Sequence, residues 1–125
     1  MIRDEALARS KRMYLTTWSA AGKPGTVPVW FTARDGDLYF TTVRTSLKAR
    51  RIARSGRARV ALGASDGPSF DVRAELVDDR PDLARDILAA YRRKYWLVAL
   101  PFVLTYMRRR LASKETVIVR LTPLG

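Results

Sequence analysis

Residues 26–59 read TVPVWFTARDGDLYFTTVRTSLKARRIARSGRAR, and this stretch decides the fold. Residues 26–33 alternate between two faces, with Val27, Val29 and Phe31 on one and Pro28, Trp30 and Thr32 on the other, which predicts a strand. Because proline donates no hydrogen bond, this strand lies at the edge of a sheet or is irregular at Pro28. Asp35-Gly36 is a strong hairpin signal, so residues 38–43 form the antiparallel partner strand.

A short basic helix follows this hairpin. Thr45 or Ser46 provides its cap, and Gly56 ends it. No Asp or Glu occurs from residue 38 to residue 65. The basic residues of that segment are Arg44, Lys48, Arg50, Arg51, Arg54, Arg57 and Arg59. A segment with this charge pattern favours an anionic ligand.

The rest of the chain adds strands and helices around this stretch. Further strands are expected at residues 13–19, 58–64, 69–78 and 116–121, and helices at residues 4–11, from Pro81 and from Pro101. Hairpin signals between consecutive strands argue against a parallel sheet. We therefore expect a mainly β (α+β) fold, an antiparallel six-stranded split β-barrel with short peripheral helices. An OB-fold is the nearest competing barrel. The length of 125 residues fits a single domain over residues 1–125.

Composition limits the chemistry. The chain contains no His and no Cys, so a Ser-His-Asp triad and a zinc-thiolate site are excluded, no metal site is expected, and no catalytic acid or base can be assigned. The net charge of +12 predicts attraction to phosphate or to anionic surfaces. The charged N-terminus has no signal-peptide pattern, and a cytoplasmic location is the default expectation.

An uncharged apolar run covers residues 95–107. Its 13 residues are fewer than the roughly 20 that a bilayer span requires, and Pro101 interrupts it. The run therefore predicts a buried or interface-facing helix pair. Because arginines flank it on both sides, a peripheral membrane contact remains open.

The start of the basic helix has the chemistry of a phosphate site. Its first turn presents unpaired N–H groups and the positive end of the helix dipole. Ser46 adds a hydroxyl, Lys48 an ammonium group, and Thr41 and Thr42 end the preceding strand with two further hydroxyls. An ordinary capped surface helix explains the same residues, and the pattern alone does not separate the two interpretations.

The ordered series YLTTWSAAGKPGTVPVWFTARDGDLYFTTVRTSLKARRIARSGRARVALG resembles the pyridoxamine-phosphate-oxidase-like split-barrel family, and within it the branch that uses the deazaflavin coenzyme F420. The shared features are a YLTT strand, a G-x-P turn, a PVWF strand, a D-G-x-L-Y hairpin, a threonine-rich strand end and a helix opening with S-x-K. The likeness covers roughly residues 14–75, and TVIVRLTP resembles the family's closing strand.

This resemblance implies a homodimer that binds a phosphorylated redox cofactor in a groove at the subunit interface and transfers hydride to a small-molecule substrate. F420 is the expected cofactor, and FMN is the alternative. Ser46 and Lys48 would hold the cofactor phosphate, with Thr41 and Thr42 beside them. Pro28, Val29 and Trp30 would run along the ring system, and Arg51 is a weaker candidate. The absence of His argues against pyridoxamine phosphate oxidase activity itself.

Two other functions remain open from the sequence. A basic small barrel could bind nucleic acid, with aromatic residues stacking on bases. However, the aromatic residues lie in alternating strands, as core residues do, and no recognition motif is present. A cofactor carrier without turnover is the third option.

Overall fold

The computed structural model describes residues 10–124. The helix expected at residues 4–11 therefore falls almost entirely outside the described residues. The strands are β1 Met13–Trp18, β2 Pro24–Val29, β3 Thr32–Arg34, β4 Asp37–Val43, β5 Arg57–Leu62, β6 Ser69–Val77 and β7 Thr116–Pro123. The helices are α2 Leu47–Ser55, α3 Pro81–Lys94, the 3-10 helix η1 Trp96–Ala99, and α4 Pro101–Ala112.

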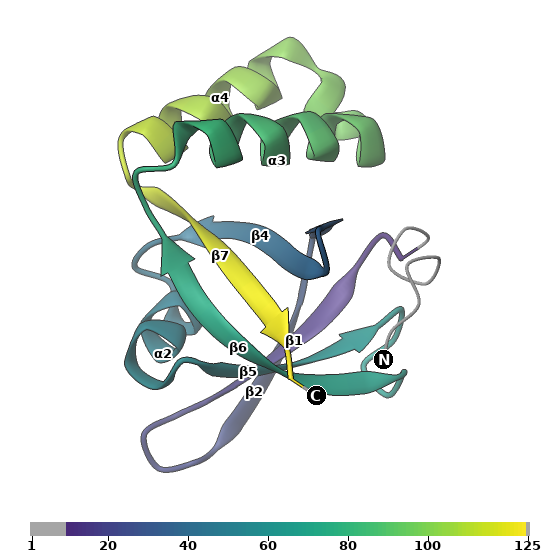
Figure 1. Ribbon diagram of the computed structural model, residues 1–125, viewed down its shortest axis with the longest axis vertical. Coiled ribbons are helices and arrows are strands. Elements are labelled where there is room, and N and C mark those ends of the chain that lie inside the picture. Colours follow the sequence, from purple (N-terminus) through teal and green to yellow (C-terminus); the bar gives the residue numbers. More distant parts are fainter. Residues whose placement is uncertain (1–9, 125) are drawn as a thin grey trace.

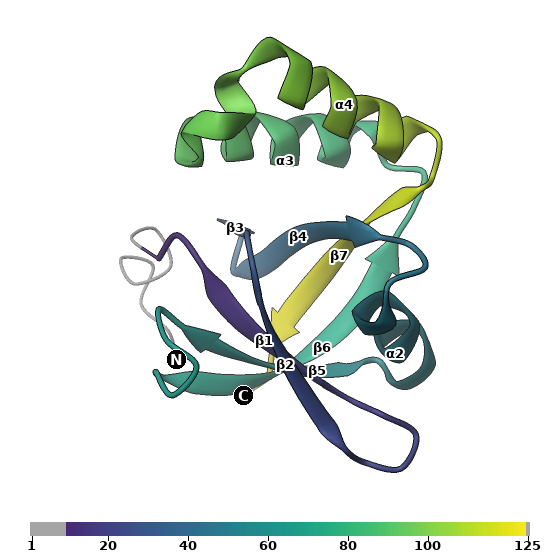
Figure 2. The same cartoon turned by 180° about the vertical axis from the view of Figure 1, so that it is seen from behind.

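The strands form one antiparallel sheet in the order β2-β1-β5-β6-β7-β4-β3. Its two edge strands, β2 and β3, are separated along the chain by only Trp30 and Phe31. Because the two edges are joined so tightly, the sheet must curl back on itself, as Figures 1 and 2 show. The split β-barrel expected from the sequence is therefore confirmed.

The expected number of six strands is wrong, since residues 10–124 form a sheet of seven. Residues 26–33 do not form one strand, because the chain leaves the β1 edge after Val29 and joins the β4 edge at Thr32. At the break, the Phe31 N–H donates to the Tyr95 hydroxyl (3.0 Å) instead of to a neighbouring strand. The side chain of Phe31 is fully buried in the barrel.

The period of two residues sorts the β4 side chains between two apolar clusters. Leu38 and Phe40 point into the barrel core, while Tyr39 lies in an outer cluster that packs under the helices. In the same way, Val72 and Ala74 of β6 are buried inside the barrel. A barrel interior filled by side chains in this way is a packed core and not a channel.

Helix α2 closes the barrel beside β1 and β6 with its buried residues Ala49 and Ile52. Of the two caps expected, Thr45 and Ser46, the N-cap is Ser46, and Gly56 ends the helix in the left-handed conformation (φ 68°). A left-handed backbone favours glycine because a Cβ atom would be strained there. The helix boundary predicted from the sequence is thus confirmed.

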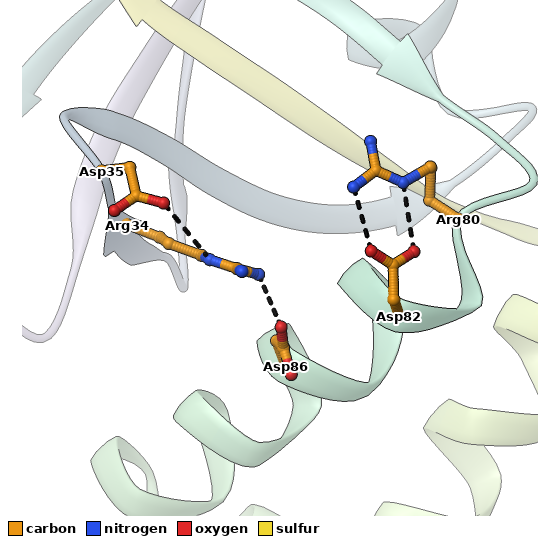
Figure 3. A network of polar contacts seen from close by, with 5 residues as sticks. All are labelled: Arg34, Asp35, Arg80, Asp82 and Asp86. Atoms are coloured by element: carbon orange, nitrogen blue, oxygen red, sulfur yellow. Dashed lines mark hydrogen bonds and ion pairs between the residues drawn. The ribbon is translucent and has the colours of Figure 1, made fainter.

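Helices α3 and α4 form a separate layer above β4 and β7 (Figure 1). Leu83, Ile87 and Tyr91 of α3 are buried against the sheet, as their spacing of four residues predicts. An ion pair between Arg34 of β3 and Asp86 of α3 (2.7 Å) ties this layer to the edge of the barrel (Figure 3).

Candidate functional site

The turn between β4 and α2 brings together three of the predicted site residues. Ser46 accepts a hydrogen bond from the backbone N–H of Ala49 (3.2 Å), and its hydroxyl lies 3.1 Å from that of Thr42. Lys48 follows in the first helical turn. Within residues 10–124, the backbone N–H groups of Leu47 and Lys48 have no hydrogen-bond partner. Two backbone donors and one ammonium group are therefore free to meet an anion.

The electrostatics of this turn favour negative charge. The first turn of α2 contains no acidic side chain. Lys48 is half-buried, and burial lowers its pKa from the ordinary value of 10.5. Because no carboxylate compensates this partly desolvated ammonium group, an incoming anion would interact with it more strongly than with a fully hydrated lysine.

Arg44 belongs to the same basic stretch but is engaged by the protein itself. Its guanidinium group donates to both carboxylate oxygens of Asp78 (2.5 and 3.2 Å) and to the Lys114 carbonyl (2.8 Å). The hydrogen bond from Arg44 lowers the pKa of Asp78. Arg44 therefore anchors the segment just before Ser46 to the end of β6.

Thr41 lies on the opposite side of β4 from Thr42. Its neighbour there is the Tyr91 side chain, whose pKa is raised mainly by burial, while the nearby Thr41 lowers it. The structure therefore separates Thr41 from the turn at Ser46, while Thr42 contacts that turn directly.

Arg51 reaches away from the start of α2 toward the β1–β2 hairpin. Its Nη1 atom lies 3.4 Å from the Thr17 carbonyl oxygen and 3.5 Å from the Thr17 hydroxyl. A Cβ atom at Gly25 would lie only 2.9 Å from the same nitrogen, so glycine provides the space that Arg51 occupies. Arg51 stabilises this junction and lies one turn beyond Lys48.

The ring-binding segment predicted at Pro28, Val29 and Trp30 occupies a different part of the molecule. Pro28 lies on edge strand β2, as expected from its missing donor. Trp30 stacks on Tyr95, with ring centroids 4.5 Å apart and an interplanar angle of 10°. Its carbonyl accepts a hydrogen bond from the Tyr91 hydroxyl (3.1 Å).

This segment is held by the end of α3. The Tyr95 hydroxyl accepts from the Phe31 N–H, and Lys94 donates to the Phe31 carbonyl (3.0 Å). Burial lowers the pKa of Lys94 to about 8, with a smaller contribution from Lys11. Within residues 10–124, no hydrogen bond or ring contact joins Pro28, Val29 or Trp30 to Ser46 or Lys48.

Sequence reasoning missed two apolar residues that flank the cap. Val43 is 45% exposed and Leu47 is 53% exposed, on either side of Ser46. The sequence did contain a signal for this exposure. An apolar residue at the end of a strand, and another at the first position of a basic helix, have no apolar neighbours in the core to pack against.

Among the cavities that residues 10–124 form are two on the helical side of the barrel, with volumes of about 570 and 340 Å³. Neither is lined by Thr42, Ser46 or Lys48. Neither of these two cavities therefore accounts for the proposed phosphate site at the start of α2.

The apolar run at residues 95–107 forms η1 and the first half of α4. It leaves Trp96 75% exposed, Phe102 72% exposed and Tyr106 59% exposed. None of the helices in residues 10–124 has the length and apolar character that crossing a bilayer requires. A peripheral membrane contact stays a prediction. Residues 10–124 also contain no group of three or more His, Cys, Asp or Glu side chains that could hold a metal ion.

A sequence model of the family described as "Pyridoxamine 5'-phosphate oxidase" matches residues 3–123. The chain belongs to this family. A comparison of this chain with curated proteins found no match in sequence.

Solved structures with the same fold come from proteins of several descriptions. The conserved hypothetical protein Rv2991 from Mycobacterium tuberculosis is 22% identical, with a TM-score of 0.79, and the match covers 100% of this chain and 82% of that chain. The heme storage protein HutZ from Vibrio cholerae is 14% identical, with a TM-score of 0.76, over 98% and 87% of the two chains. A protein described as an F420 reductase is 19% identical, with a TM-score of 0.61, over 100% and 95%. At these identities the likeness shows the fold alone.

Proposed function

We propose that this family member is an F420-dependent oxidoreductase that holds the cofactor phosphate at the start of α2. The observation that carries the proposal is the uncompensated first turn of α2, where two free backbone N–H groups, the Ser46 hydroxyl and the half-buried Lys48 ammonium group meet without an acidic neighbour. These donors fit a phosphate group.

The strength of such a site is sufficient to anchor a cofactor. Hydrogen bonds to charged groups contribute about 1.5–3 kcal/mol each, and micromolar binding requires roughly 8 kcal/mol. Two or three contacts at Ser46 and Lys48 would supply a large share of that free energy. Contacts to the ring system would supply the remainder.

The bound deazaflavin supplies the hydride chemistry, so the protein has to bind, orient and exclude water. In that scheme Ser46 and Lys48 bind the phosphate, Thr42 fixes the Ser46 hydroxyl, and Arg44 fixes the loop before the cap. A chain without His or Cys can perform these roles. We assign no proton-transfer residue.

We place the ring groove between two copies of the chain. Pro28, Val29 and Trp30 do not contact the start of α2 within one chain, whereas a groove between two chains could bring such segments together. The exposed Val43 and Leu47 lie beside Ser46, where a second chain could cover them. This arrangement agrees with the homodimer that the family resemblance implies.

FMN is the alternative cofactor, because its phosphate would meet the same donors. Heme is less well supported as a ligand, because the common axial ligands His and Cys are both absent from this chain. Nucleic acid binding has less support, because Tyr39 and Phe40 of β4 are buried and cannot stack on bases, and no recognition motif accompanies the exposed Trp96, Phe102 and Tyr106. Binding without turnover remains a distinct outcome.

Titration of the purified protein with F420 and with FMN, followed by cofactor fluorescence, tests the proposal. We expect micromolar binding of F420 and weaker binding of FMN. If only FMN binds with micromolar affinity, FMN is the cofactor. If neither F420 nor FMN binds, the proposal is refuted. Reduced F420 that binds but reduces no acceptor would indicate a carrier.

A further inference from the structure

We propose that the larger cavity, between α3, α4 and the neighbouring ends of β6 and β7, is a binding site for a small amphipathic anion, an aliphatic chain with a carboxylate or phosphate head group. Its volume of about 570 Å³ is within the range of roughly 300–1,000 Å³ that is usual for small-molecule sites. The inference is independent of the proposed cofactor, because the cavity is not lined by Ser46 or Lys48.

The interior of this cavity is apolar. Helices α3 and α4 and strand β7 contribute its main apolar side chains, which are Ala84, Leu88, Leu104, Leu111, Val117 and Ile118. Several of these residues belong to the outer apolar cluster or pack against it. Transfer of an aliphatic chain from water to such a surface contributes roughly 0.8 kcal/mol per CH₂ group. The floor of the cavity therefore favours a hydrocarbon tail.

The rim of the cavity is basic. Its cations are Arg80, Arg85, Arg92, Arg108 and Lys114. Two of them are neutralised: Arg80 pairs with Asp82 (3.0 Å, Figure 3), and Lys114 pairs with Asp79 (3.2 Å). The other acidic residue at the cavity, Asp78, is already paired with Arg44. No unpaired carboxylate is therefore left to compensate the remaining rim cations.

Three arginines at the rim have no acidic partner within residues 10–124. Arg85 and Arg92 are two helical turns apart on α3, and Arg108 approaches from α4. Guanidinium groups bind carboxylate and phosphate through paired N–H donors. An apolar floor below three uncompensated guanidinium groups is complementary to a ligand with a hydrocarbon tail and a negative head.

Isothermal titration calorimetry with three probes of equal chain length tests this inference. Decanoate and decyl phosphate carry the two candidate head groups, and decan-1-ol has the same tail without a charge. We expect at least one of the anions to bind and decan-1-ol to bind at least roughly tenfold more weakly, a difference of about 1.4 kcal/mol. The stronger of the two anions identifies the preferred head group. Absence of binding, or equal binding of decan-1-ol, would overturn the inference.

Two variants locate the bound anion. Arg108→Gln should weaken binding by roughly three- to tenfold, because an exposed guanidinium contact is partly screened. Arg109→Gln is the matched control, since Arg109 is the next residue on α4 and does not line the cavity. Ala112→Trp places an indole at the cavity wall from an exposed position and should abolish binding. Equal affinities for the Arg108 and Arg109 variants, or normal binding by a folded Ala112→Trp variant, would contradict the assignment. If Ala112→Trp does not fold, the two arginine variants decide alone.

Discussion

The hydroxyl oxygens of Thr42 and Ser46 lie 3.1 Å apart, so the end of strand β4 is linked by side chains to the cap of helix α2. Thr42 is buried, and Ser46 at the same time accepts the N–H of Ala49. This link fixes the Ser46 hydroxyl at the helix start, beside the free N–H groups of the first turn. The proposed phosphate site is therefore held in place by hydrogen bonds within the protein itself.

Replacing Ser46 by alanine should destabilise the protein by about 0.5–2 kcal/mol, because an N-cap hydrogen bond is lost. Urea unfolding followed by circular dichroism measures this change. Ser65→Ala, at an exposed turn position, is the matched control and should stay within about 0.5 kcal/mol of wild type. An unchanged unfolding midpoint for Ser46→Ala would show that the cap contributes little to folding.

Tyr95→Phe should destabilise the protein by about 1–3 kcal/mol, because the buried N–H of Phe31 loses its acceptor. The ring remains, so stacking on Trp30 is retained. Tyr106→Phe serves as the control, since Tyr106 is exposed and its hydroxyl contacts only Arg110 among the described residues. If the two variants unfold at the same urea concentration, Tyr95 does not hold the break between β2 and β3.

Lys94 should give the folding free energy a characteristic pH dependence. Burial lowers the pKa of Lys94 from 10.5 to about 8 in the folded protein. Between these two pH values the unfolded chain binds more protons, so stability contributed by this residue rises with pH. The wild type should therefore gain stability relative to Lys94→Met as the pH increases from 8 to 10.5. Parallel pH profiles for the two proteins would contradict this shift.

Leu47→Asp should weaken the proposed homodimer, because a carboxylate would replace an exposed apolar side chain beside the site. Sedimentation velocity over a range of protein concentrations measures the change. Leu124→Asp introduces the same charge at a leucine that is 56% exposed near the C-terminus, and it should leave the assembly intact. If the wild-type protein sediments as a monomer at all concentrations, the proposed homodimer is wrong.

Local patterns in the sequence were sufficient for most of the fold. The alternation of residues 38–43 puts Leu38 and Phe40 on the opposite face from Tyr39, and the structure has them in two different apolar clusters. Residue type narrowed the cap to Thr45 or Ser46, and it was sufficient to end the helix at Gly56. Such features depend on neighbours within a few positions, so the sequence displays them directly.

Features that depend on distant contacts were not predictable in this way. The break at Trp30 and Phe31 requires Tyr91, Lys94 and Tyr95, which lie more than sixty positions further along the chain. Arg51 reaches Thr17 through a long side chain whose direction the sequence does not specify. For Thr41 the local pattern was available, because a period of two places it opposite Thr42, but the two residues were grouped together both as hydroxyl donors at the strand end and through the family resemblance.

The most direct test of the central claim is the affinity of F420 for the Lys48→Ala variant, measured by fluorescence titration beside wild type and Lys23→Ala. Lys23 is an exposed lysine on the β1–β2 hairpin, so its removal changes the net charge equally without altering the start of α2. We expect micromolar binding by wild type and Lys23→Ala, and an affinity roughly 10- to 150-fold lower for Lys48→Ala, equivalent to a lost charge-assisted hydrogen bond of about 1.5–3 kcal/mol. Equal binding of F420 by all three proteins would contradict the claim that this helix start holds the cofactor phosphate.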